Sequence, residues 1–308
     1  ALGLNQREVQ ICSTGIIGVP LPIERIEPKI GGLAESLSRN SEPAAEAIMT
    51  SDTKPKSVAV TVKIGDKKVK IGAIAKGSGM INPHMATMLC FITTDAAVTK
   101  AELVAATREA VDMSFNRISV DGDMSTNDTV VVMANHQAGN KTITRSGTGS
   151  SEFREALTEV MQCLARKIVS DGERVTKLVE IQVRGAASQL DAERVARAVA
   201  NSKLVKCSWN GNDPNWGRVI HAVGYSGARV KEELVDIYFD GVLATQNGVA
   251  AKTDIGKLSA AVKDSEFTVG IDLNLGKGEF NVWSSDLSPE YVEFNREEYA
   301  LNRKTTKR

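Results

Sequence analysis

The sequence predicts a layered α+β fold. Apolar residues alternate with other residues over 57–64 and 69–74, which indicates strands, and they recur at helical spacing over 21–38. Strand-like and helix-like segments follow one another without a regular strand–helix–strand repeat, which favours layered α+β over a doubly wound parallel sheet. The 308 residues suffice for one large or two moderate domains, and we expect a boundary near residue 175.

The first half of the chain is expected to hold a short strand at 9–14, several helices and a hairpin. Pro28 lies inside the helical pattern of 21–38, where it kinks or divides the helix. Gly65-Asp66 is the turn between the hairpin strands, and Thr99 is a suitable N-cap for the next helix. The remaining expected elements are helices at 44–49 and 100–113 and strands at 88–94 and 130–133.

The second half begins with a long helix at 152–169, followed by a strand at 180–184 and a helix at 191–200. We expect Asp213 to cap a further helix, with Pro214 at its first position. The segments 267–273 and 279–283 are predicted to form a hairpin over Gly276. The other expected elements are strands at 204–208 and 235–239 and the capped helix at 215–223. Residues 176–308 would then form a smaller α+β subdomain.

The composition limits the classes of function. Lys plus Arg and Asp plus Glu both number 38, so the formal net charge is zero and no nucleic-acid partner is indicated. No apolar run reaches the roughly 18 residues of a membrane span. The cysteines and histidines show no metal-ligand spacing, so we expect free thiols and no metal site. These residues are Cys12, Cys90, Cys163, Cys207, His84, His136 and His221.

The stretch 76–94 contains the junction with the clearest functional signal in the chain. There a glycine-rich loop meets an apolar strand at Ala86-Thr87, a small residue followed by a hydroxyl residue. This is the local chemistry of a self-cleaving peptide bond. Cleavage would leave Thr87 with a free α-amine of pKa about 7.7–8.0, which can act as the base for its own hydroxyl. An ordinary loop that enters a strand gives the same short pattern.

Longer blocks resemble the ornithine acetyltransferase family, the bifunctional glutamate N-acetyltransferases of arginine biosynthesis. They keep the family's order from about residue 12 to residue 295. The resemblance implies an α/β/β/α sandwich over 1–175 that contains the processing site, with 176–308 contributing to the substrate pocket. Family members carry a sizeable stretch before this point, so we expect an N-terminally truncated chain. The blocks are KGSGMI-x-P-x-MATML, STGIIG, AIMTSDT, SFNRISVDGDMSTNDT, SDGE and NDPNWGR.

The resemblance implies roles for particular residues. Thr87 would be the nucleophile, and Thr14 with Gly15 would hold the oxyanion of the tetrahedral intermediate. That intermediate needs hydrogen-bond donors fixed in advance, although Ser-Thr-Gly is also a common end to a strand. The implied substrate contacts are Thr50, Lys76, Thr87, Glu173 and Asn295.

Lys76 can act in two ways. A cation near the Thr87 amine would keep that amine unprotonated, or it would receive the carboxylate of a substrate; a solvated surface lysine is the simpler alternative. A phosphate-binding loop is excluded, because the chain has no GxxxxGK[ST] motif. Glu173 suits the ammonium group of an amino acid, or is a charge at a helix end.

The Asp-rich loop after residue 120 lacks the order of a calcium loop, so we interpret it as a hydrogen-bonded structural turn. Its polar residues are Asp121, Asp123, Asn127 and Asp128. The tail departs from the family pattern. Asn295 matches, but Tyr299 lies one position late and Ala300 stands where a hydroxyl residue is usual. Either Thr305 or Thr306 substitutes for it, or one substrate contact is lost.

The expected function is ping-pong transfer of an acetyl group from N2-acetyl-ornithine to glutamate through acetyl-Thr87. No metal or redox cofactor is implied, and acetyl-CoA as an additional donor is left open. The expected partners are the other chain of the processed protein and further copies of that pair, without nucleic acid or membrane. We expect a cytoplasmic protein, or one of the mitochondrial matrix in a eukaryote. The alternatives are an N-terminal-nucleophile hydrolase or aminopeptidase and an inactive amino-acid-binding paralogue.

Overall fold

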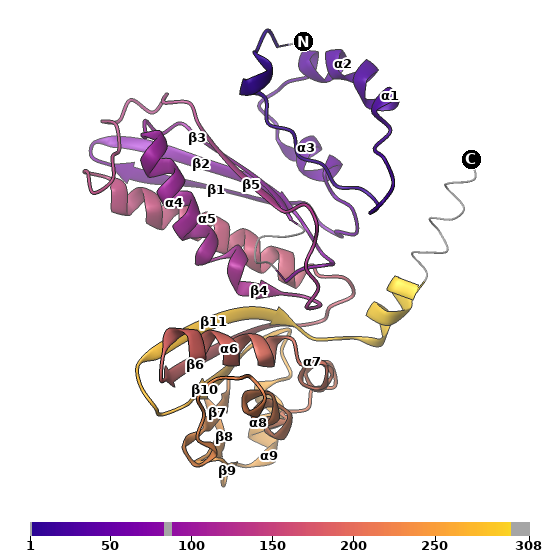
Figure 1. Cartoon of the computed structure of the whole chain (residues 1–308), viewed down its shortest axis with the longest axis vertical. Coiled ribbons are helices and arrows are strands. Elements are labelled where there is room, and N and C mark those ends of the chain that lie inside the picture. Colours follow the sequence, from indigo (N-terminus) through magenta and orange to yellow (C-terminus); the bar gives the residue numbers. More distant parts are fainter. Residues whose placement is uncertain (1, 83–87, 297–308) are drawn as a thin grey trace.

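The computed structural model describes residues 2–82 and 88–296. Two β-sheets with packed helices form the body of the molecule (Figure 1), which confirms the α+β class. The expected processing site, Ala86 and Thr87, lies outside the described residues.

The four-stranded sheet has the order β1-β2-β3-β5, with β1 at Lys56–Ile64, β2 at Lys67–Lys76, β3 at Leu89–Thr94 and β5 at Thr129–Ala134. The predicted hairpin is present as β1 and β2, and Gly65 takes the positive φ (62°) of its turn. In the antiparallel pair of β2 and β3, Lys76 lies opposite Leu89. The loop that leaves β2 and the segment that enters β3 therefore meet at one end of this sheet.

The helices α4 (Lys100–Asp112) and α5 (Ser150–Ser170) pack together on this sheet. Thr99 caps α4 as predicted and accepts a hydrogen bond from the Glu102 amide. Helix α5 contacts β1 and β2 of the first sheet and also β4 (Ile118–Ser119) and β11 (Gly278–Ser285) of the second. Figure 1 shows this helix pair between the two sheets, whereas the resemblance implied helices on the outer faces. The wide buried stripe of α5 explains this position, because it provides apolar surface toward both sheets.

The seven-stranded sheet has the order β4-β11-β6-β10-β7-β8-β9. The predicted hairpin of 267–273 with 279–283 is wrong, because β6 (Leu178–Ala186) lies between β10 (Glu266–Asp272) and β11 and pairs with both. The connection crosses the end of β6, where the amides of Leu275 and Gly276 donate to the Gly185 carbonyl. The remaining strands are β7 (Asp236–Phe239), β8 (Val242–Gln246) and β9 (Val249–Ala250).

Two further predictions for this half, one of a strand and one of a helix N-cap, are also wrong. The expected strand at 204–208 is helix α7 (Lys203–Asn210), because Ser202 caps it and Trp209 is buried on one face. The N-cap of α8 (Trp216–Gly224) is Asn215 rather than Asp213, since the Asn215 side chain accepts from the Arg218 amide. The other helices here are α6 (Gln189–Ala200), α9 (Ile255–Ala261) and the short 3-10 turn η4 (Glu232–Leu234).

The N-terminal segment contains short helices. Pro28 divides the predicted helix as α1 (Ile23–Ile26), η2 (Glu27–Lys29) and α2 (Ile30–Glu35), whereas 9–14 forms no strand. Its apolar side chains stay exposed, Leu33 at 62%, because no sheet or long helix packs on them in the described residues (Figure 1). The remaining short elements of the chain are η1 (Gln6–Glu8), α3 (Glu42–Ala47) and η3 (Phe115–Arg117).

The buried apolar side chains form two clusters. The first runs from Ile64 to Leu178 and adds Trp283, and the second runs from Val179 to Val282. The first surrounds α5 and the second lies between the seven-stranded sheet and the helices on it. None of the helices that the structure describes is long and apolar enough to cross a membrane.

Candidate active site

The loop that leaves β2 is held by polar contacts on both sides. The Gly77 amide donates to Asp52 Oδ1 (2.8 Å), and the Ser78 hydroxyl lies 3.2 Å from that of Ser51. Further along, the amides of Met80 and Ile81 donate to the Asp121 carboxylate at 2.6 and 3.0 Å. Asp121 is therefore part of a structural turn, as predicted, but it also fixes a distant loop.

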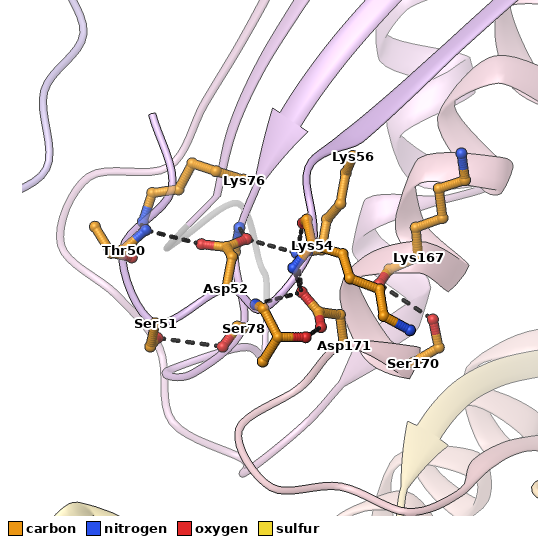
Figure 2. A network of polar contacts seen from close by, with 12 residues as sticks. Thr50, Ser51, Asp52, Lys54, Lys56, Lys76, Ser78, Lys167, Ser170 and Asp171 are labelled. Carbon is orange, nitrogen blue, oxygen red and sulfur yellow. Dashed lines mark hydrogen bonds and ion pairs between the residues drawn. The ribbon is translucent and has the colours of Figure 1, made fainter. Parts of the chain in front are cut away.

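A buried ion network supports the start of this loop (Figure 2). The Lys56 ammonium lies 2.6 Å from Asp52 and 2.6 Å from Asp171 at the end of α5. Asp171 also accepts from the Thr53 amide (3.0 Å). Burial opposes ionisation of Asp52, but hydrogen bonds from the Gly77 amide, from Lys56 and from Thr50 outweigh it and lower the pKa of this carboxyl. Asp52 is therefore an ionised anchor for the loop.

Lys76 is buried and contacts another predicted substrate residue. Only 2% of the residue is exposed, so it is not a solvated surface lysine, and its Nζ donates to Thr50 Oγ1 at 3.1 Å. Burial lowers the pKa of Lys76, while the carboxylates of Asp52, Asp128 and Glu173 favour its charged form. Lys76 is thus a desolvated cation among several acidic groups.

Glu173 and Asn295 form the second contacting pair. Asn295 Nδ2 donates to Glu173 Oε2 at 3.1 Å, and the Glu173 amide donates to the Ser78 carbonyl. The Glu173 carboxylate lies against the backbone of Gly79, where a Cβ atom would collide with it. Glu173 also interacts electrostatically with Lys76. The two pairs of predicted substrate residues therefore belong to one neighbourhood.

Thr14 is linked to the Asp-rich loop. Asn127 Nδ2 donates to the Thr14 hydroxyl oxygen at 3.1 Å and to the Ser13 carbonyl. Because the hydroxyl oxygen accepts from Asn127, the hydroxyl proton is directed to another acceptor. Gly15 follows Thr14 and is exposed. The loop around Thr14 thus lies beside Asn127.

Asp128 holds the backbone where β3 begins. Its Oδ1 accepts from the amide of Met88, the residue that directly follows Thr87 in the chain. Its Oδ2 is buried and has no hydrogen-bond partner among the described residues. Burial raises the pKa of Asp128 to about 7, although the Met88 amide and the charge of Lys76 favour ionisation. Asp128 thus holds the first described residue after the segment that contains Thr87, while Glu173 holds the loop before it at Ser78 and Gly79.

The sequence comparisons agree on one family. The ArgJ family model matches residues 1–300. The chain belongs to the ArgJ family. It is 50% identical over 296 residues to the arginine biosynthesis bifunctional protein ArgJ of Geobacter sulfurreducens, covering 96% of this chain and 75% of that protein. It is 42% identical over 306 residues to the glutamate N-acetyltransferase of Methanocaldococcus jannaschii, again covering 96% and 75%.

A solved ArgJ structure has a similar fold. The crystal structure of the arginine biosynthesis bifunctional protein ArgJ from Bacillus halodurans superposes with a TM-score of 0.65 at 38% identity. The match covers 67% of this chain and 97% of that one. The likeness supports the mixed α+β arrangement of two sheets and helices.

The family blocks are present in the sequence, yet Asp52 and Asp171 were not singled out, and Asp128 was interpreted only as part of a structural turn. Asp52 lies in the block AIMTSDT, Asp128 in SFNRISVDGDMSTNDT and Asp171 in SDGE. Each holds backbone amides from a distant part of the chain. The sequence signal that could have found these residues is a carboxylate next to hydroxyl residues within a family block. No group of three potential metal ligands occurs in the part of the chain that the structure describes.

Proposed function

We propose that this protein transfers an acetyl group from N2-acetyl-ornithine to glutamate through an acetylated Thr87. Glutamate acetylation of this kind belongs to arginine biosynthesis, in keeping with the names of its ArgJ relatives. The observation that carries the proposal is the convergence of the Lys76–Thr50 and Glu173–Asn295 pairs at the loop beside β3. These residues supply one buried cation and one carboxylate in a single neighbourhood.

This pair of charges suits an α-amino acid. The Lys76 ammonium complements an α-carboxylate, and the Glu173 carboxylate complements an ammonium group. Both proposed substrates share an α-carboxylate, so one site can receive them in turn, as ping-pong transfer requires. The burial of Lys76 strengthens its attraction for an anion, because less water screens the charge.

We propose that self-cleavage after Ala86 exposes the α-amine of Thr87. Its α-amine then activates its hydroxyl, and Thr14 with Gly15 stabilises the oxyanion. The hydrogen bond from Asn127 to Thr14 Oγ1 supports this role, since it leaves the hydroxyl proton available as a donor. Acetyl-CoA is proposed only as an additional acetyl donor.

We also propose the wider organisation of the protein. The two buried clusters, which meet at residues 178 and 179, support a catalytic domain over 1–175 and a subdomain over 176–308. The cleaved halves are proposed to stay together and to assemble into a larger homo-oligomer. Because the matched relatives are bacterial and archaeal, we propose that the protein acts in the cytoplasm.

The test combines product analysis with intact mass. The purified protein with N2-acetyl-ornithine and glutamate should form N-acetylglutamate and ornithine in equal amounts, and its mass spectrum should give two fragments split at Ala86/Thr87. Thr87→Ala should stay one chain and be inactive. A Thr87→Ala protein that is still split there would assign the cleavage to a protease. Acetate in place of N-acetylglutamate would favour a hydrolase, and binding without turnover would favour an inactive paralogue.

A further inference from the structure

The chain that follows β11 is anchored to the segment that follows α5. Asp286 is buried, and its carboxylate accepts from the amides of Thr176 and Lys177 at 2.8 and 3.0 Å. Asn210 of α7 also donates to this carboxylate at 2.8 Å. Shortly afterwards the chain becomes helical at 289–296, the yellow helix beyond β11 in Figure 1. Asp286 therefore fixes the connection between β11 and this terminal helix.

Ser288 links the start of the terminal helix to the residue next to Glu173. It is the N-cap of the helix, because its hydroxyl oxygen accepts from the Tyr291 amide at 3.1 Å and Pro289 takes the first helical position. The same hydroxyl donates to the Arg174 carbonyl at 2.7 Å. Only 3% of Ser288 is exposed, so little water competes for these two hydrogen bonds. One hydroxyl thus begins the helix and fixes it to the loop that carries Glu173.

Arg174 has a backbone conformation that needs support from its surroundings. Its φ of 57° lies in the left-handed region, which is uncommon for a residue with a side chain. Its guanidinium carbon lies 4.8 Å from the ring centroid of Phe294, so the terminal helix contacts both the backbone and the side chain of Arg174. The preceding residue, Glu173, donates its amide to the Ser78 carbonyl at 3.1 Å. These contacts hold the turn that places Glu173 against the loop after β2.

We propose that Ser288 is a positioning residue of the substrate site, which holds Asn295 against Glu173 by fixing the helix of one to the loop of the other. Asn295 Nδ2 donates to Glu173 Oε2 and to the Tyr291 carbonyl, each at 3.1 Å. Ser288 accepts from the amide of the same Tyr291, so hydrogen bonds along the first turns of the helix connect Ser288 to Asn295. The inference rests on the proposed function, because it requires that Glu173 and Asn295 bind the substrate.

Ser288→Ala removes both hydrogen bonds, and Ser226→Ala is the matched control. The Ser226 hydroxyl donates to the Val223 carbonyl at 2.7 Å and accepts from the Ala228 amide at 3.3 Å, all within one turn after α8. For Ser288→Ala we expect KM for N2-acetyl-ornithine and for glutamate to rise about tenfold, the effect of losing about one hydrogen bond, with kcat near the wild type. Ser226→Ala should keep both KM values. Wild-type KM values for both substrates in Ser288→Ala would overturn the positioning role.

Two further variants separate positioning from a loss of stability. Ser288→Thr keeps the hydroxyl and should hold both KM values near the wild type, whereas values as high as those of Ser288→Ala would overturn the role of the hydroxyl. In the Asn295→Ala background, Ser288→Ala should change KM little, because the residue through which Ser288 acts is absent. The full rise of KM in that background would overturn the link to Asn295. A lower kcat with unchanged KM would show that Ser288 only stabilises the fold.

Amide hydrogen exchange tests the contact without using activity. In Ser288→Ala, the peptides over 289–296 and 172–175 should exchange faster, while β11 keeps its wild-type rate because Asp286 still anchors the chain. Unchanged exchange over 289–296 would contradict the proposed contact. Should Ser288→Ala not fold, Ser288→Gly replaces it, since glycine is a tolerated N-cap but has no hydroxyl for Arg174. The same rise of KM is then expected, and a wild-type KM would overturn the proposal.

The outcomes distinguish this inference from the proposed function. If the wild type forms no N-acetylglutamate, the proposed function fails, while hydrogen exchange still decides whether Ser288 holds the terminal helix to the loop of Glu173. If the wild type is active and Ser288→Ala keeps its KM values, the proposed function stands and the positioning role is wrong.

Discussion

At the scale of single residues, Lys76 differs from the solvent-exposed lysines of the chain because its side chain is buried. The sequence places Lys76 before a glycine loop, where a solvated side chain is the simplest expectation. In the structure the side chain is enclosed and donates to Thr50. Its lowered pKa follows from lost hydration, a property of the surroundings and not of the residue type.

Thr14→Val tests the oxyanion role. Valine has nearly the same shape but no hydroxyl, so kcat should fall by about 10²–10³ with little change in KM. Steady-state kinetics with N2-acetyl-ornithine measure this. Thr14→Ser is the control, because it keeps the hydroxyl beside Asn127 and should retain most activity. An unchanged kcat in Thr14→Val would leave Thr14 with a purely structural role.

Gly79→Ala tests the position of Glu173. The added methyl group would displace the Glu173 carboxylate and break its contact with Asn295. Because the end of a flexible side chain moves, Tm should change little, while KM for both substrates should rise about tenfold or more. Gly224→Ala is the control, since nothing lies within 4 Å of its Cβ position. Equal KM values for the two variants would argue against substrate binding by Glu173.

At the scale of elements, caps and periodic patterns were reliable where the local signal was complete. The β1–β2 hairpin and the Thr99 cap of α4 follow from residues within a few positions of one another. The segment 204–208 was predicted as a strand, but a cap at Ser202 and burial of Trp209 make it helical. The β10–β11 hairpin failed because β6 inserts between two segments that are adjacent in sequence.

Lys56→Met tests the network that joins β1, the 50–54 loop and the end of α5. The substitution leaves Asp52 and Asp171 without their shared cation in a buried place, so the free energy of unfolding should fall by about 3–5 kcal/mol. Urea denaturation measures this. Lys67→Met is the control, because its pair with Asp66 is exposed (46% and 82%) and should contribute little to stability. Equal losses in the two variants would show that the network does not stabilise the fold.

At the scale of the whole molecule, a polar junction joins the two buried clusters. Lys206 of α7 is fully buried and donates to Ser284 Oγ and to the Ser285 carbonyl at the end of β11. The Ser285 hydroxyl donates to the Val120 carbonyl on the side of the first cluster (3.3 Å). This junction makes the relative position of the two clusters depend on hydrogen bonds as well as on apolar packing.

Lys206→Met gives a pH-dependent prediction. Burial lowers the pKa of Lys206 to about 8, whereas the unfolded chain keeps a value near 10.5. A lysine whose pKa is depressed by folding contributes stability above its unfolded pKa and loses it as the pH falls through the folded pKa. The stability of the wild type relative to Lys206→Met should therefore increase from about pH 8 to about pH 10.5. Denaturant titrations at these pH values measure this, and a difference that is flat or falls with pH would contradict the burial of a charged Lys206.

The sequence by itself determined the α+β class, most helices, the hairpin and the blocks that indicate the ArgJ family. These features depend on periodicity, caps and residue order, which act over a few neighbouring positions. The tertiary structure decided the strand order, the helical state of α7 and the burial of Lys76 and Lys206. The contacts responsible join distant positions, such as Lys56 to Asp171 across 115 residues and Met88 to Asp128 across 40. A local pattern cannot specify which distant residues will bury a charged side chain. That burial sets the pKa values of the groups in the site.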